Sequence, residues 1–167
     1  MAAENNFVTD NIKTGEGDLS ITFLGHATLM ISFNGKIIHI DPVSQYANYS
    51  KMPKADLILV THDHYDHCDL EAIDAIRTDK TIMVITQDAA GQIKGGIIMK
   101  NGDKKTVQGL LIEAVPAYNL VNMRSPGVPY HGKGIGNGYV ITCGGKRIYI
   151  AGDTENIAEM RVSKILI

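Results

Sequence analysis

The chain has 167 residues, of which 44% are hydrophobic and 20% charged, and its formal net charge is −2. This is the composition of an ordinary soluble globular domain that is long enough to bury a core. The small net charge and the absence of a lysine or arginine cluster argue against nucleic acid or an anionic membrane as a partner.

The sequence also lacks signals for membrane insertion or export. No apolar run is long enough to span a bilayer. Residues 1–6 lack the basic-then-apolar pattern of a signal peptide. We therefore expect a cytoplasmic protein, although a mature exported protein without its signal would look the same.

The first part of the chain predicts hairpins. Residues 1–18 are polar, and we expect a loosely held lead-in with a short strand around Asn6–Val8. Asn34 and Gly35 tolerate positive φ and predict a type I′ turn between two strands. Alternating or mostly apolar residues predict three strands, over residues 19–24, 28–33 and 36–40.

A strand–helix–strand pattern follows a loop over residues 43–54. The unbroken apolar run at 55–60 predicts a strand buried on both faces. Asp69 is a candidate N-cap for a helix over 70–77, and Asp88 for a short helix that ends at Gln92. Another apolar strand is expected between these helices, over residues 81–86.

The rest of the chain predicts mainly strands. Residues 119–133 are expected to form a long loop, and Pro116 to close the strand before it. We expect short strands over residues 97–99, 105–107, 110–115, 139–142 and 147–150. Early hairpins, a strand–helix–strand unit and further hairpins indicate a mixed α/β layered domain.

Three histidines and two aspartates fall within residues 62–67, directly after the apolar strand. Core packing does not explain this density, whereas imidazole and carboxylate are ligands of zinc and similar divalent ions. His62 and His64 are two residues apart and can project to the same side toward one metal. Asp66 and His67 lie where the chain turns into the helix and can face a second one.

The pattern His-x-His-x-Asp-His after a buried strand resembles the signature of the metallo-β-lactamase superfamily. The sequences LGHAT at 24–28, IDP at 40–42 and AGDT at 151–154 are similar to those of its lactonase-like branch, the hydrolases related to ascorbate-6-phosphate lactonase. The resemblance covers about residues 19–160. It implies a layered αββα sandwich, with residues 19–167 forming the hydrolase domain.

The resemblance also implies two divalent metal ions, zinc by default, with manganese or iron as alternatives. His62 and His64 would bind the first ion, Asp66 and His67 the second, and Asp153 would bridge both. A third histidine should complete the first site. We favour His131 for this role, with water or Asn119 as the alternative, because many relatives place the ligand directly after the strand.

Other residues are expected around the ions. His26 should contact the substrate or donate a proton, with a hydrogen-bonded structural histidine as the alternative. Asp66 would relay a proton to the leaving group, Asp41 and Thr61 would support the histidines from behind, and His39 would pack in a strand.

Family members continue well past the AGDT sequence, whereas this chain has 13 more residues after Thr154 and no further histidine. We therefore expect an incomplete second metal site and a sandwich whose second half lacks its C-terminal part. The apolar surface left uncovered would favour a homo-oligomer.

The function expected from this resemblance is metal-dependent hydrolysis of a lactone or another ester-like small molecule. One alternative is a phosphodiesterase or nuclease of the same fold. The other is a degenerate metal-binding relative without turnover.

Overall fold

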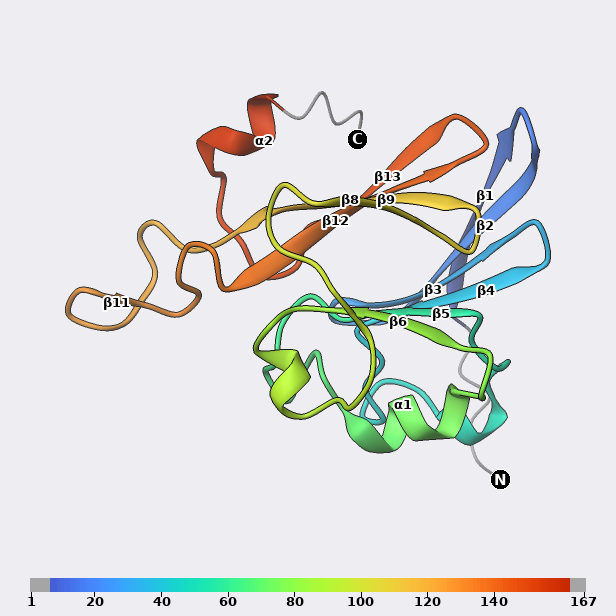
Figure 1. Cartoon of the computed structure of the whole chain (residues 1–167), viewed down its shortest axis with the longest axis horizontal. Helices are drawn as coiled ribbons and strands as arrows, with labels where there is room; N and C mark the ends of the chain where they lie inside the picture. The colour runs from blue at the N-terminus through green and yellow to red at the C-terminus, as the bar shows by residue number, and fades with distance from the viewer. Residues whose placement is uncertain (1–6, 163–167) are drawn as a thin grey trace.

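The computed structural model describes residues 7–162, which form two β-sheets that lie face to face (Figure 1). The seven-stranded sheet has the order β1-β2-β3-β4-β5-β6-β7, and the four-stranded sheet has the order β13-β12-β9-β8. The strands of the first sheet are β1 (Val8–Thr14), β2 (Gly17–Gly25), β3 (Thr28–Phe33), β4 (Lys36–Ile40), β5 (Leu57–Leu59), β6 (Ile82–Ile85) and β7 (Ile97–Ile98). Those of the second are β8 (Lys104–Val107), β9 (Leu110–Ala117), β12 (Gly136–Cys143) and β13 (Lys146–Ile150).

Helices lie outside the two sheets, which gives the layered αββα arrangement expected from the sequence. Helix α1 (Leu70–Ile76) packs on the outer side of the seven-stranded sheet, and α2 (Ala158–Val162) lies on the side of the four-stranded sheet (Figure 1). Two 3₁₀ turns, η1 (Tyr49–Lys51) and η2 (Ala89–Gly91), complete the helical elements of the described residues. No described helix is long and apolar enough to cross a membrane.

Strand β5 explains why its sequence is apolar without interruption. Leu57 and Leu59 belong to the core between the two sheets, whereas Ile58 and Val60 belong to the core beneath α1. All four side chains are fully buried. Because successive side chains of a strand point to opposite faces, burial on both faces requires an apolar residue at every position.

The first hairpins follow the expected turn chemistry. Asn34 and Gly35 have φ values of 50° and 71°, as the predicted type I′ turn requires. Strands β3 and β4 pair antiparallel across this turn, and β4, β5 and β6 are then parallel neighbours. The parallel strands end at one edge of the sheet, where the histidine loop follows β5.

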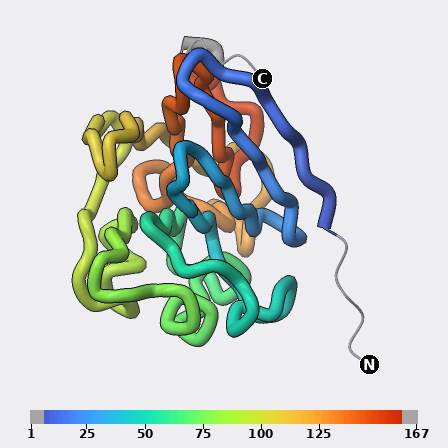
Figure 2. The backbone as a smooth tube through the Cα atoms, turned by 90° about the vertical axis from the view of Figure 1, so that its right-hand side faces the viewer, coloured from blue at the N-terminus to red at the C-terminus, as the bar shows by residue number. Residues whose placement is uncertain are grey.

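The lead-in expected over residues 1–18 contains a seven-residue strand. Strand β1 pairs with β2 from Val8 opposite Phe23 to Thr14 opposite Gly17, and Ile12 packs against the main core. At the tip of this hairpin the amide of Gly15 donates to the carbonyl of Gly144, at 3.4 Å. Figure 2 shows the hairpin in blue beside the end of the second sheet. The strand expected around Asn6–Val8 begins outside the described residues.

Three further expectations were wrong in detail. The predicted loop over residues 119–133 contains a small hairpin, β10 (Met123–Ser125) and β11 (Val128–Pro129). Pro116 does not close β9 but pairs with Asn137 of β12. Strand β8, on the other side of β9, pairs only as far as Glu113. No amide donor toward β8 is therefore needed at Pro116. Asp88 makes no cap hydrogen bond to η2, and the hydroxyl of Thr86 accepts from the amide of Ala89 instead.

Candidate metal centre

Loops from both sheets meet at one edge of the molecule and bring five imidazoles and a carboxylate together. Their side chains form two groups, each with donor atoms within 4.8 Å of one another. The first group is His62, His64 and His131, and the second is His26, His67 and Asp153. The ring centroids of His62 and His67 are 4.1 Å apart, so the two groups adjoin. Such a cluster of nitrogen and oxygen donors is what a divalent transition metal binds.

Three loops around the cluster contain a residue in an unusual backbone conformation. His26 follows β2 with φ 50°, and Asp41 follows β4 with φ 43°. Gly152, before Asp153, has φ 61°, and a Cβ there would lie 2.9 Å from the carbonyl oxygen of Asn137. Residues in the left-handed region are uncommon outside glycine and concentrate at functional sites, where the surrounding structure holds them.

Hydrogen bonds behind the rings fix which nitrogen of each histidine faces the cluster. Asp41 Oδ2 lies 2.8 Å from His67 Nδ1 and 2.6 Å from Thr61 Oγ1. A carboxylate can only accept, so Nδ1 of His67 carries its proton. Because the Thr61 hydroxyl donates to Asp41, its oxygen is left to accept from His62 Nδ1–H, at 3.0 Å. The Nε2 atoms of His62 and His67 therefore point into the cluster.

These two Nε2 atoms show that the residues fit a metal. Both are buried and have no hydrogen-bond partner among the described residues. His67 Nε2 is 3.1 Å from Asp153 Oδ1, which is ion-pair distance without hydrogen-bond alignment. Buried polar atoms are nearly always paired, and a bound cation would satisfy both imidazoles at once.

Burial and charge shift the acid–base properties of the cluster. Burial raises the pKa of Asp41, although His67 and Thr61 oppose this. Burial alone would lower the pKa of His67, but contacts with Asp153 and Asp41 outweigh it and raise the pKa to about 10. The pKa of Asp153 falls to about 2, mainly through its contact with His67. The two carboxylates thus form an environment that strongly favours a positive charge at His67 Nε2.

Asp153 stands between the two groups. Its Oδ1 faces His67 Nε2, and its Oδ2 lies 3.3 Å from His131 Nε2. Burial is the main cause of the lowered pKa of His62, about 3, and of the lowered pKa of His131, so both imidazoles favour the neutral form that binds metals. One carboxylate therefore presents one oxygen to each group.

His131, rather than Asn119, lies in the cluster. Its Nε2 is 3.1 Å from His64 Nδ1, whereas its Nδ1 is 2.7 Å from Asn119 Oδ1 on the far side. Asn119 thus supports His131 from behind. The sequence gives no local signal for this contact, because Asn119 and His131 are brought together by the β10–β11 hairpin that lies between them in the chain.

Asp66 is not among the residues of the two donor groups, and its role as a ligand of the second ion stays a prediction. Its Oδ2 is 3.5 Å from the Nε2 atom of His26, which lies in the group of His67 and Asp153. The side chain of His26 is 41% exposed, so this pair forms the open rim of the cluster. The LGHAT sequence marked His26 as a pocket residue but not as a neighbour of His67. Tyr65 points to solvent and is 83% exposed.

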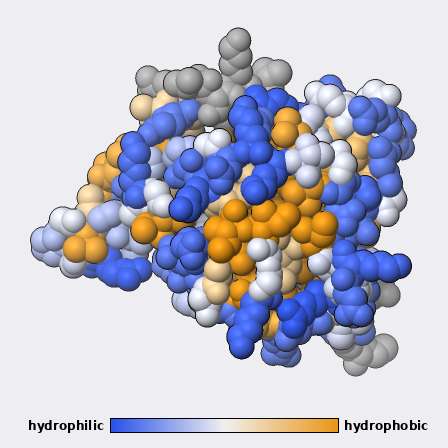
Figure 3. Space-filling model, in the orientation of Figure 1, coloured by the Kyte–Doolittle hydropathy of each residue, from blue (hydrophilic) through white to orange (hydrophobic). Residues whose placement is uncertain are grey.

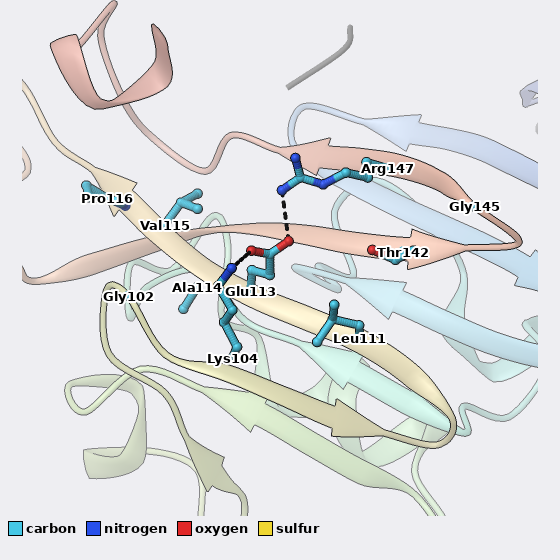
Figure 4. A pocket seen from close by; sticks show the side chains of 10 residues that line it. All are labelled: Gly102, Lys104, Leu111, Glu113, Ala114, Val115, Pro116, Thr142, Gly145 and Arg147. Atoms are coloured by element: carbon cyan, nitrogen blue, oxygen red, sulfur yellow. Dashed lines mark hydrogen bonds and ion pairs between the residues drawn. The ribbon is translucent and has the colours of Figure 1, made fainter. Parts of the chain in front are cut away.

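A hollow of about 650 Å³ lies away from the cluster, against the four-stranded sheet, where Glu113 bridges Lys104 and Arg147 (Figure 4). None of the cluster residues lines it. The histidine cluster and this hollow are therefore separate features.

The fold is shared with known proteins. Residues 20–165 match the family model for the beta-lactamase superfamily domain. The chain belongs to this superfamily. A crystal structure of a metal-dependent hydrolase from Parabacteroides distasonis superimposes with a TM-score of 0.88 at 44% identity, covering 93% of this chain and 70% of the other.

Curated relatives of the chain are also named metal-dependent hydrolases. A UPF0173 metal-dependent hydrolase from Thermococcus kodakarensis is 36% identical over 151 residues, which cover 85% of this chain and 64% of the relative. One from Methanosarcina mazei is 31% identical, with 87% and 65% covered. The chain thus spans just under two thirds of the length of these curated relatives. The diiron β-hydroxylase CmlA from Streptomyces venezuelae, at 18% identity and a TM-score of 0.66, shares the fold alone.

Proposed function

We propose that the protein is a metal-dependent hydrolase that holds two divalent cations, zinc by default, and cleaves a lactone or another ester-like small molecule. The observation that carries this proposal is the pair of adjoining donor groups with two buried, unpartnered Nε2 atoms. The hydrolase names of the relatives and the resemblance of LGHAT and AGDT to the lactonase-like branch support it.

The ligand assignment follows the hydrogen bonds. The first cation would be held by His62, His64 and His131, and the second by His67. Asp153, whose two oxygens lie near His67 and His131, would contribute to both sites. His26 is close enough to complete the second site.

The reaction divides between the cations and the protein. When bound, two divalent ions supply Lewis acidity that lowers the pKa of water and polarises an ester carbonyl. Thr61 and Asp41 keep the imidazole rings oriented, and the buried strands beneath exclude bulk water. If His26 is not a ligand, it and Asp66, paired at the open rim, would pass a proton to the leaving oxygen.

Metal analysis tests the binding half of the proposal. Protein purified without chelator should contain two ions per chain by inductively coupled plasma mass spectrometry. His64→Ala should lose the first ion. Tyr65→Ala is the matched control, because Tyr65 lies in the same loop and faces solvent. One ion or none in the unaltered protein would contradict a two-metal site.

Activity assays test the substrate class. A panel of aliphatic lactones and p-nitrophenyl esters should be hydrolysed by the metal-loaded protein and not after chelation. Turnover of bis(p-nitrophenyl) phosphate alone would replace the proposal with a phosphodiesterase. His26→Ala separates two roles: loss of turnover with both ions retained indicates a proton donor, and loss of the second ion indicates a ligand.

A further inference from the structure

Glu155 has an unusual concentration of hydrogen-bond donors around its partly exposed carboxylate. Two residues after Asp153, it accepts from five donors that all lie in residues 119–122. Oε2 accepts from the amides of Leu120 and Val121, both at 2.8 Å. Oε1 accepts from the Asn122 amide at 2.8 Å and from the side-chain amides of Asn119 and Asn122, at 3.0 and 2.6 Å. Successive backbone amides that converge in this way form a nest for an anion.

Asn119 connects this carboxylate to the metal cluster. Its Nδ2 donates to Glu155, and its Oδ1 accepts from two donors of His131, the backbone amide at 3.0 Å and Nδ1–H at 2.7 Å. The other ring nitrogen, His131 Nε2, faces His64 and Asp153. A continuous path of polar contacts therefore runs from Glu155 through Asn119 to His131.

The direction of the Asn119 amide decides which nitrogen of His131 is free. A flipped amide would turn its NH₂ group toward the backbone N–H of His131, where two donors would meet. An acceptor at Nδ2 prevents that flip, and Glu155 supplies it. With Oδ1 held toward the ring, the proton stays on Nδ1 and the lone pair of Nε2 points into the cluster.

The backbone around Glu155 strengthens the coupling. The amide of Glu155 donates to the carbonyl of Tyr118 at 3.1 Å, and the Thr154 hydroxyl lies 3.2 Å from both the amide and the carbonyl of Tyr118. The segment that carries Asp153 is thus fastened to the segment that carries Asn119.

We propose that Glu155 is a positioning residue of the metal centre, which acts through Asn119 to hold His131 in the Nδ1–H tautomer with Nε2 toward the first site. The inference rests on the proposed function, because it takes His131 as a ligand. It adds a residue outside the two donor groups whose removal changes metal binding without removing a ligand.

The test compares Glu155→Gln with Glu159→Gln. Glu159 carries a neighbouring carboxylate that contacts Tyr118 and Lys133. In Glu155→Gln the affinity of the first site for Zn²⁺, measured by competition with a chromophoric chelator, should fall about 10–100-fold. The Co²⁺ absorption spectrum should change as well. Glu159→Gln should match the unaltered protein in both measurements.

A readout without metal separates positioning from general loop stability. Long-range ¹H–¹⁵N spectra of the metal-free protein should show the Nδ1–H tautomer of His131 in the unaltered chain and in Glu159→Gln, and a mixture in Glu155→Gln. Glu155→Asp keeps the charge on a shorter arm and should lie between them. It serves as the second variant if Glu155→Gln does not fold.

Each outcome has one meaning. An unchanged tautomer in the Glu155 variants overturns the inference, even where metal affinity falls. If the unaltered protein binds no metal, the proposed function fails, while the tautomer still decides whether Glu155 positions His131.

Discussion

The hydroxyl of Thr61 donates to Asp41 and accepts from His62, so a single side chain orients one histidine and supports the carboxylate that orients another. His39 lies close by on β4 but takes no part in this arrangement. Its ring is fully buried, with Nε2 3.1 Å from the carbonyl oxygen of Pro53 and its centroid 5.7 Å from that of Tyr49. His39 is thus a packing residue whose neutral form the fold requires.

This requirement predicts a pH dependence of stability. Burial lowers the pKa of His39 from 6.5 to about 4. Between these values the unfolded chain takes up a proton that the folded one does not, so stability is fully present above pH 6.5 and declines toward pH 4. When the pH falls from 7.5 to 5.0, the His39 contribution should lower the free energy of unfolding of the unaltered protein by about 2 kcal/mol.

The comparison is with His39→Gln, which keeps a donor for Pro53 but does not titrate. Urea unfolding of both proteins at the two pH values, with chelator present throughout, measures the difference. Between the two pH values, the free energy of unfolding should fall by about 2 kcal/mol less in the variant than in the unaltered protein. Equal declines in the two proteins would show that His39 is protonated in the folded state.

Sequence spacing predicts contacts within a loop better than contacts between loops. The histidine loop was found because its donors lie within six residues and follow a buried strand. The position of His26 beside His67 could not be predicted, because β3, β4 and β5 come between them and the register of those strands decides it. Asn119 was weighed as a ligand, and its support of His131 depends on the path of the intervening hairpin.

At the scale of elements, α1 is held to the sheet by its cap as well as its apolar face. Ile73 and Ile76 are buried in the core beneath the seven-stranded sheet. Asp69 accepts from the amides of Glu71 and Ala72, as its N-cap position predicted, and also from Ser44 in another loop, at 2.8 Å. The cap therefore fixes the helix start directly after the histidine loop.

Removing this cap should destabilise the fold. Asp69→Ala leaves two helix amides and one loop amide without their acceptor, and a lost N-cap costs about 1–2 kcal/mol. Asp74→Ala in the same helix is the control, because Asp74 is 61% exposed and contacts only Arg77 among the described residues. Denaturant unfolding should show the larger loss for Asp69→Ala. Losses of equal size would mean that the cap contributes nothing beyond surface charge.

The two strand pairs that the sequence does not predict differ in composition. Residues of β1 are mostly exposed, so this strand lacks the apolar alternation that predicts β2. The β10–β11 hairpin has the opposite composition, since Leu120, Val121, Met123, Val128 and Tyr130 around it are exposed. Figure 3 shows hydrophobic residues on the surface of the arm that carries β11. Pairing across a short turn, rather than burial, defines both hairpins.

At the scale of the whole molecule, the cluster is built from loops of both sheets. His26, His62 and His67 follow strands of the seven-stranded sheet, whereas His131 and Asp153 belong to loops of the four-stranded sheet. The amide of Asn137 donates to the carbonyl of Thr61 at 2.9 Å and joins the same two halves. A cation bound by both groups would therefore link the two sheets. It would bind the folded chain and not the unfolded chain.

Metal binding should consequently raise the stability of the entire domain. A ligand present at 100 times its dissociation constant stabilises the native state by about 2.7 kcal/mol. For a chain of this size, that corresponds to a rise in Tm of roughly 5–10 °C. Differential scanning fluorimetry of chelator-treated protein with and without added Zn²⁺ measures the shift. His64→Ala and His67→Ala, one from each donor group, should each show a smaller rise. Tyr65→Ala should keep the full rise, and an unchanged Tm in the unaltered protein would mean that the cluster holds no metal in the folded state.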